Sequence, residues 1–107
     1  MELDQYRIIL VNLDPTVGSE IKKTRPCVII SPDELNLNIR TITVAPMTTK
    51  SHHYPTRIQV HHNNKSGWVV LDQIRTIDKQ RAIKSFDKLT PKEIIKIKAV
   101  IKETFVD

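Results

Sequence analysis

The chain has 107 residues, a length that suits one domain spanning residues 1–107 with a single hydrophobic core. Its apolar fraction of 39% argues against disorder, and no apolar run approaches the ~20 residues of a membrane span. No basic-then-apolar leader opens the chain, and the lone Cys27 excludes an internal disulfide and fits a reducing cytosol. The formal net charge of +5 favours an anionic partner such as nucleic acid, although charge alone does not locate a site.

The first half of the chain predicts three strands separated by polar segments. Residues 6–13 form an apolar run without a breaker, which is typical of a central strand with two apolar faces. Residues 16–24 follow as a polar loop, and residues 25–30 predict a second strand. A single helical turn is expected at residues 34–38, before the alternating third strand of residues 40–45.

The second half predicts another polar loop, a hairpin and a further extended segment. These are, in order, the loop 46–55, the strand 56–61, the turn 62–67, the strand 68–71, the bending strand 72–81 and the weaker strand or turn 82–89.

Residues 90–105 carry the clearest helix signal. Thr90 is the expected N-cap, Pro91 occupies the first helical position, and Glu93 completes a capping box. Leu89 and Ile94 fit a hydrophobic staple around it. The predicted apolar stripe contains Ile94, Ile97, Val100, Ile101, Thr104 and Phe105. Short strands, two long loops and a late helix predict a mostly-β fold, a small, strongly curved antiparallel barrel.

Arg25 stands where the first loop becomes a strand. Because Pro26 follows it, we expect an extended backbone at Arg25, whose guanidinium presents a planar fork of donors that matches a phosphate. The hydroxyl of Thr48, in the second loop, would donate to the same group if the curved sheet brought the two loops together. The alternative is that Arg25 and Lys23 are surface charges paired with Glu20.

Other polar side chains suggest weaker sites. Histidine pairs at residues 52–53 and 61–62 suggest zinc ligands, but adjacent strand residues point to opposite faces and no Cys or carboxylate stands at a motif spacing. Solvated loop histidines are the simpler interpretation. Cys27, inside an apolar run, indicates an inert core thiol. A basic series that starts at Arg75 either extends a track for nucleic acid or forms an ordinary solvated strand face.

The runs VNLDPTVGSEIKKTRPCVIISPD, TITVAPMTTK and GWVVLDQIRTIDKQR, taken together, resemble the MazF/PemK family of toxin endoribonucleases over nearly the whole chain. The resemblance implies an SH3-like curved antiparallel barrel with a C-terminal helix, of the CcdB/PemK-like kind. It implies a cytoplasmic homodimer that cuts single-stranded RNA such as mRNA without a metal or cofactor, leaving 2′,3′-cyclic phosphate and 5′-hydroxyl ends. It also implies inhibition by a cognate antitoxin with an acidic, flexible segment, and no membrane partner.

The same resemblance assigns roles to individual residues. Arg25 and Thr48 match the family's catalytic pair. The resemblance assigns Ser19, Glu20 and Gln73 to RNA binding, and the polar or basic side chains of Lys23, Thr49 and Arg75 complete the expected RNA-binding set. Because a guanidinium stays protonated, the general base is left open between Glu20, His52 and no protein group. The turn at residues 62–67 is this chain's own, so the RNA sequence preference does not transfer.

Two other functions remain open at this point. A toxin that binds a gyrase-like protein on the same fold would need neither Arg25 nor Thr48. A non-catalytic RNA-binding barrel would bind RNA with strong salt dependence and leave it intact. Small barrels of that kind often stack bases on aromatic side chains, and aromatic residues make up only 5% of this chain.

Overall fold

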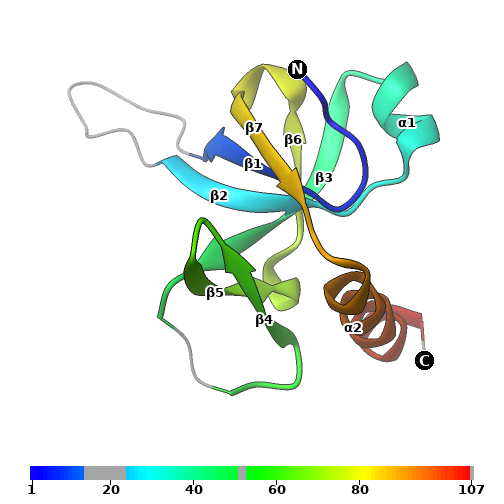
Figure 1. Cartoon of the computed structure of the whole chain (residues 1–107). Helices are drawn as coiled ribbons and strands as arrows, with labels where there is room; N and C mark the ends of the chain where they lie inside the picture. The colour runs from blue at the N-terminus through cyan, green and yellow to red at the C-terminus, as the bar shows by residue number, and fades with distance from the viewer. Residues whose placement is uncertain (14–23, 51–52, 107) are drawn as a thin grey trace.

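The chain folds into a curled antiparallel sheet with a helix packed beside it near the C-terminus (Figure 1). The computed structural model describes residues 1–13, 24–50 and 53–106. The strands are β1 (Arg7–Asn12), β2 (Thr24–Ile29), β3 (Thr41–Thr48), β4 (Arg57–His62), β5 (Lys65–Val70), β6 (Arg75–Asp78) and β7 (Ala82–Lys88). The helices are α1 (Asp33–Asn38) and α2 (Pro91–Ile101), with the 3-10 turns η1 (Leu71–Gln73) and η2 (Lys79–Arg81) and a π-helical turn η3 (Lys102–Val106). The mostly-β barrel with a late helix is thereby confirmed.

Strand β1 is central, as its apolar sequence predicts. The sheet order is β4-β5-β3-β2-β1-β7, with β6 paired to β3, and each pairing is antiparallel. Ile8 belongs to one buried cluster, shared with Val28 of β2 and Ile97 of α2. Ile9 belongs to a second cluster on the other face of the strand. Both faces of β1 are therefore covered, which explains its lack of polar alternation.

Strand β3 makes the sheet curl because one of its edges is shared by two partners. Residues Thr41–Val44 pair with β6, whereas Met47 and Thr48 pair with β5. Pro46 lies between these two pairings, where its missing N–H removes no ladder bond on that side. The prediction that a loop begins at Pro46 is therefore wrong, because pairing with β5 prolongs the strand through Thr48.

The β4–β5 hairpin has a tighter turn than the predicted one at residues 62–67. Strand β4 continues through His62 and β5 begins at Lys65, so only two residues connect them. Asn63 and Asn64 have φ values of 51° and 60°. Two consecutive positive φ angles define a type I′ turn, which asparagine tolerates and which suits the twist of paired strands.

The segment after β5 alternates short turns with strands. Residues 72–81 were expected to continue as one bending strand, but only Arg75–Asp78 are extended, between η1 and η2. The chain turns at η1, where Leu71 is buried. It turns again at η2, where Asp78 accepts a hydrogen bond from the backbone N–H of Gln80 (2.8 Å). The weaker segment that follows is a full strand, β7, because β1 pairs with it.

Helix α2 has the predicted capping box. The Glu93 N–H donates to the Thr90 hydroxyl (3.3 Å), and the Thr90 N–H donates to a Glu93 carboxylate oxygen (2.9 Å). Ile97 is fully buried against the sheet, with Leu89 and Ile94 in the same cluster. The predicted stripe is wrong at its end, because Thr104 and Phe105 are exposed in η3. Within the described ranges, no helix is long and apolar enough to cross a bilayer.

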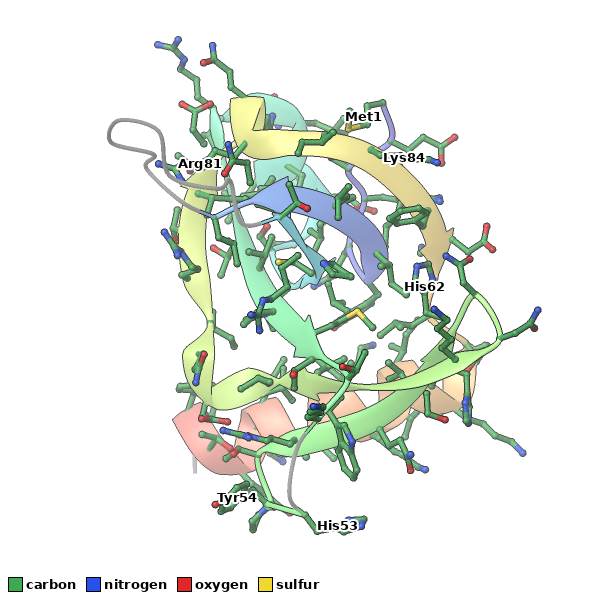
Figure 2. The ribbon with its side chains drawn as sticks, turned by 90° about the vertical axis from the view of Figure 1, so that its left-hand side faces the viewer. Met1, His53, Tyr54, His62, Arg81 and Lys84 are labelled. Atoms are coloured by element: carbon green, nitrogen blue, oxygen red, sulfur yellow. The ribbon has the colours of Figure 1, made fainter. Side chains whose placement is uncertain are left out.

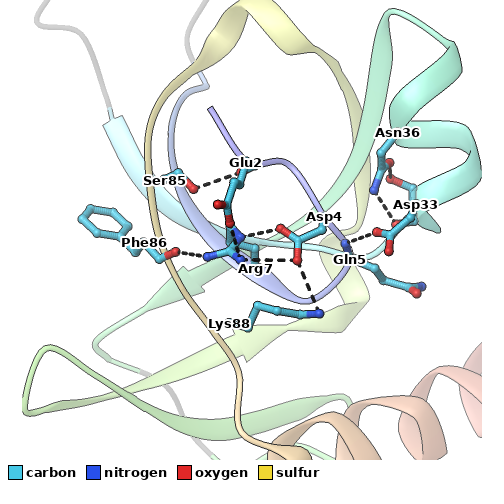
Figure 3. Close-up of polar contacts among 10 residues, drawn as sticks. Glu2, Asp4, Gln5, Arg7, Asp33, Asn36, Ser85, Phe86 and Lys88 are labelled. Carbon is cyan, nitrogen blue, oxygen red and sulfur yellow. Dashed lines mark hydrogen bonds and ion pairs between the residues drawn. The ribbon is translucent and has the colours of Figure 1, made fainter.

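A polar network ties the N-terminal segment to the sheet (Figure 3). Arg7 forms ion pairs with Asp4 and with Glu2 (2.6 Å), and it donates to the backbone oxygen of Phe86 in β7 (2.7 Å). Lys88 lies 3.4 Å from the Asp4 carboxylate. These contacts hold the residues before β1 against the end of β7.

Candidate active site

Arg25 is the second residue of β2, in the extended conformation that its proline neighbour predicts. Its side chain is exposed, and its backbone position faces Val11 of β1. After the half-buried Pro26, the residues Cys27, Val28 and Ile29 are fully buried. The strand is therefore anchored in the core from two residues after Arg25, which leaves a guanidinium at the surface on a rigid support.

The pairing of β2 with β3 relates Arg25 to Thr48. Strands β2 and β3 pair Ile29 with Val44, Val28 with Ala45 and Cys27 with Pro46. Continued by two residues beyond its last pair, this register would set Arg25 opposite Thr48, and Pro26, which follows Arg25, lines one pocket together with Thr48. Directly opposed residues in an antiparallel pair have Cβ atoms about 4.5–5.5 Å apart and point to the same face. The register is therefore compatible with the phosphate site that the sequence predicts at Arg25 and Thr48.

The hydroxyl of Thr48 is held by the turn that follows β3. Thr48 Oγ1 donates to the backbone oxygen of Lys50 (3.1 Å) and accepts from the Lys50 N–H (3.3 Å). The side chain is half-buried, and Thr49 beside it is exposed. A rotation about χ1 would release the hydroxyl toward a ligand. Thr48 therefore has a defined resting position at the end of a strand rather than in a long loop.

A second guanidinium, that of Arg75, belongs to the same region. Arg75 in β6 is exposed and pairs with Val44 of β3, on the face that carries Cys27 and Ile29. Burial raises the pKa of the Cys27 thiol to about 12, whereas the charges of Arg25 and Arg75 act in the opposite direction. Both guanidinium groups thus lie near enough to influence one buried thiol, which is an inert core residue as predicted.

The structure describes only some of the remaining predicted site residues. Gln73 is exposed in η1, two residues before Arg75 in the chain. Ser19, Glu20 and Lys23 lie outside the described residues. The candidate site among the described residues therefore draws on Arg25 of β2, Thr48 of β3 and Arg75 of β6, with Thr49 following β3 and Gln73 in η1.

Trp68 is a residue of this site that sequence analysis missed. It pairs with Thr48 on one side and with Gln59 on the other, so β3, β5 and β4 carry one cross-strand row, which the continued β2–β3 register would extend to Arg25. We call Arg25, Thr48, Trp68 and Gln59 the cross-strand row. The sequence signal that could have pointed to Trp68 is its alternation along the strand with Gly67 and Val69, which are buried. The sequence does not reveal, however, that β5 pairs with the end of β3.

A pocket lies at the end of β3, next to Thr48. It has a volume of about 270 Å³ and lies between the end of β3 and the β4–β5 hairpin. Its lining includes Pro26 and Met47, with Thr48, His62 and Ser66 also contributing. Gly67 forms part of its wall, where an added Cβ would lie 3.5 Å from the backbone oxygen of Thr48.

The histidines do not form a metal centre in the part of the chain that is described. There, no group of three or more His, Cys, Asp or Glu side chains is placed to hold a metal ion. His53 and His62 appear in different parts of Figure 2, and each contacts an aromatic ring. The Nδ1 atom of His61 lies 3.2 Å from the hydroxyl oxygen of Ser66. His52 lies outside the described residues.

Comparison with known proteins identifies the family. A sequence model described as a PemK-like, MazF-like toxin of type II toxin-antitoxin systems matches residues 4–105. The endoribonuclease toxin MazF of Escherichia coli K12 is 32% identical over 99 residues, which cover 92% of this chain and 89% of that protein. The endoribonuclease MazF of Staphylococcus saprophyticus is 31% identical over 100 residues, covering 88% and 83%.

Solved structures share the fold at lower sequence identity. A MazE-MazF structure from Deinococcus radiodurans has a TM-score of 0.82 at 22% identity and covers 94% of this chain and 93% of its own. An endoribonuclease in complex with its cognate antitoxin, from a mycobacterial species, has a TM-score of 0.81 at 18% identity and covers 95% and 93%. From the family match over residues 4–105, the relatives above 30% identity and the shared curled sheet, we conclude that this chain belongs to the PemK-like, MazF-like family of type II toxins.

Proposed function

We propose that this protein is the toxin of a type II toxin–antitoxin system and acts as a metal-independent, sequence-specific endoribonuclease on single-stranded RNA, chiefly mRNA. The observation that carries the proposal is the register of β2 and β3, which, continued by two residues, would bring the exposed Arg25 opposite Thr48. Relatives over 30% identical are named endoribonucleases, which supports the same reaction. Cutting mRNA would stop translation and growth.

The reaction uses a nucleophile that RNA itself supplies. The 2′-oxygen next to the scissile phosphate attacks phosphorus, the 2′-O–P bond forms, and the bond from phosphorus to the 5′-oxygen breaks. The products are a 2′,3′-cyclic phosphate and a 5′-hydroxyl. Arg25 binds the phosphate oxygens and stabilises the charge that builds up on them, while Thr48 donates its hydroxyl to the same group.

The proton of the 2′-hydroxyl must be taken by a group other than the Arg25 guanidinium. A guanidinium stays protonated, so Arg25 is suited to donate toward the leaving 5′-oxygen rather than to deprotonate the 2′-hydroxyl. Glu20, His52 or solvent takes that proton. Arg75 and Gln73 lie on the neighbouring strand and turn, where they would bind flanking phosphates and bases, with Thr49, Ser19, Glu20 and Lys23 as further RNA-binding residues.

The proposal extends to partners and location. An antitoxin with an acidic, flexible segment would compete with RNA for the face that bears Arg25 and Arg75, because both ligands are polyanions. Related structures are described as toxin–antitoxin complexes, which supports such a partner. We also propose a homodimer that acts in the cytoplasm, where its RNA substrate is translated.

Cleavage of a mixed-sequence single-stranded RNA in excess EDTA tests the reaction. We expect discrete fragments with cyclic-phosphate and 5′-hydroxyl ends from the wild-type protein. Arg25→Ala should lower the rate by at least about 100-fold, because charge stabilisation of this kind is worth roughly 10²–10³ in rate. Arg25→Lys should also be strongly impaired, since an ammonium group does not reproduce the planar fork.

The matched control is Lys96→Ala, which removes a charge from the exposed side of α2 and should cleave at the wild-type rate. Circular dichroism of each variant would check the fold. Full activity of Arg25→Ala would contradict the assignment of Arg25. Intact RNA with all proteins, on two RNAs of different sequence, would instead favour a toxin that binds a protein target or a non-catalytic RNA-binding barrel.

A further inference from the structure

We propose that Trp68 stacks on a nucleobase of the bound RNA, next to the phosphate that Arg25 and Thr48 contact. This inference rests on the proposed ribonuclease function. It adds a residue that fixes the position of the substrate and contributes to the choice of cut site.

The placement of Trp68 follows from two strand pairings. It is directly opposite Thr48 in β3 and directly opposite Gln59 in β4. Residues paired in this way share a face, with Cβ atoms about 4.5–5.5 Å apart. The indole therefore stands beside Thr48, on the face to which the continued β2–β3 register would bring Arg25. A base attached to a sugar next to the phosphate at Thr48 is within reach of the ring.

The surroundings of Trp68 indicate that the indole is not there to fill the core. Its neighbours in β5, Gly67 and Val69, are buried, whereas Trp68 is half-buried on the opposite side of the strand. Neither buried cluster found among the described residues includes it. A large aromatic ring that is left partly open to solvent provides an apolar face at low entropic cost, which suits stacking.

A second ring supports the indole from one direction. The centroids of the His53 and Trp68 rings are 4.9 Å apart and the planes are at 88°, an edge-to-face contact. Figure 2 shows His53 at the end of the molecule where the chain approaches β4. This contact limits the rotation of the indole. Since the neighbours Thr48, Gln59 and His53 all carry hydrogen-bonding groups, the surface suits a nucleobase, with polar edges around a flat apolar ring, better than an apolar peptide.

Intrinsic fluorescence offers a direct test because Trp68 is the sole tryptophan of the chain. The wild-type protein would be titrated with an RNA that carries a 2′-deoxy nucleotide at the mapped cut site, so that the nucleophile is absent. Anisotropy of a dye on the RNA would report binding separately. We expect tryptophan fluorescence to change with the same saturation curve as anisotropy. Saturating RNA binding without any change in fluorescence would overturn the proposal.

Variants measure how much stacking contributes. Trp68→Leu keeps an apolar side chain but loses the flat ring, and we expect RNA to bind roughly 5- to 150-fold more weakly. Trp68→Phe should restore part of the loss, since it keeps an aromatic face. Phe105→Leu is the matched control, because Phe105 is 57% exposed in η3, and it should bind as the wild type does.

An abasic scan identifies the stacked nucleotide. Single bases around the cut site would be deleted one at a time, and each RNA would be tested with wild-type and Trp68→Leu proteins. At the stacked position, deleting the base should weaken wild-type binding and leave the variant nearly unchanged, which is the coupling expected of a direct contact. Equal losses for both proteins at all positions would contradict stacking. If the wild type cleaves RNA in this case, the ribonuclease function stands while the role of Trp68 fails.

Discussion

At the scale of single residues, the hydroxyl of Thr48 has two roles that compete. In the structure it exchanges hydrogen bonds with the backbone of Lys50 at 3.1 and 3.3 Å, which orders the turn after β3. In the proposed reaction it donates to a phosphate oxygen next to Arg25. Binding of RNA would therefore exchange a local bond for one with the substrate, and the side chain must keep a hydroxyl for both.

Substitution of Thr48 separates the hydroxyl from the shape of the side chain. Thr48→Val should lower kcat by roughly 10²–10³, the cost of losing one donor aimed at developing charge, with little effect on KM. Thr48→Ser should keep most of the activity. Single-turnover cleavage at saturating RNA would measure both. A Thr48→Val protein with wild-type kcat would show that the hydroxyl takes no part in the reaction.

At the scale of elements, one carboxylate joins helix α2 to the sheet. Glu93 completes the capping box with Thr90, and its other oxygen accepts the backbone N–H of His61 in β4 (2.9 Å). The first turn of the helix is thus fixed to the strand that carries Gln59 of the cross-strand row. The capping box can be predicted from the sequence, whereas the hydrogen bond to β4 cannot, because it joins residues far apart in the chain.

Alanine substitutions distinguish the cap from the tertiary contact. Thr90→Ala should lower the free energy of unfolding by about 1 kcal/mol, a usual value for an N-cap. Glu93→Ala should cost about 2 kcal/mol, because the bond to His61 is lost as well. Urea unfolding would give both values, with Glu103→Ala in the exposed η3 as a control. Equal losses for Thr90→Ala and Glu93→Ala would mean that the contact with β4 adds no stability.

At the scale of the whole molecule, the polar contacts of Arg7 hold the N-terminal segment before β1 against the end of β7 (Figure 3). The hydrogen bond from Arg7 is the main cause that lowers the pKa of Asp4 below its ordinary value of 3.8, and Lys88 adds to this effect. The same contact raises the pKa of Arg7. Because the folded state lowers the pKa of Asp4, ionised Asp4 stabilises the fold above pH 3.8, and this contribution disappears as the pH falls through the lowered pKa.

Thermal unfolding across pH tests this linkage. At pH 7, Asp4→Asn should cost about 1 kcal/mol, which lowers Tm by roughly 4–8 °C for a domain of this size. The difference from wild type should persist down to about pH 5 and close as the pH drops below 3.8. Glu34→Gln, at an exposed position of α1, should have no such effect. A difference that stayed constant below pH 3 would show that the Asp4 charge is not its source.

Local features of the fold were predictable because they depend on residues near one another in the chain. The apolar run of β1, the extended backbone at Arg25 and the cap of α2 each follow from a few adjacent side chains. The inert character of Cys27 follows in the same way, from the apolar residues around it. The sequence alone also determined the family, since its motifs occur as blocks along most of the chain.

The tertiary structure decided which strand ends meet. Thr48 belongs to β3 rather than to a loop because β5 pairs with it, and that pairing also places Trp68 in the cross-strand row. Pairing between strands that are distant in the sequence depends on the register and on the curl of the whole sheet, neither of which leaves a local pattern. For this reason the sequence alone supplied Arg25 and Thr48 as candidates, while only the folded sheet placed Thr48 beside the single tryptophan and set the β2–β3 register that would align Arg25 with both.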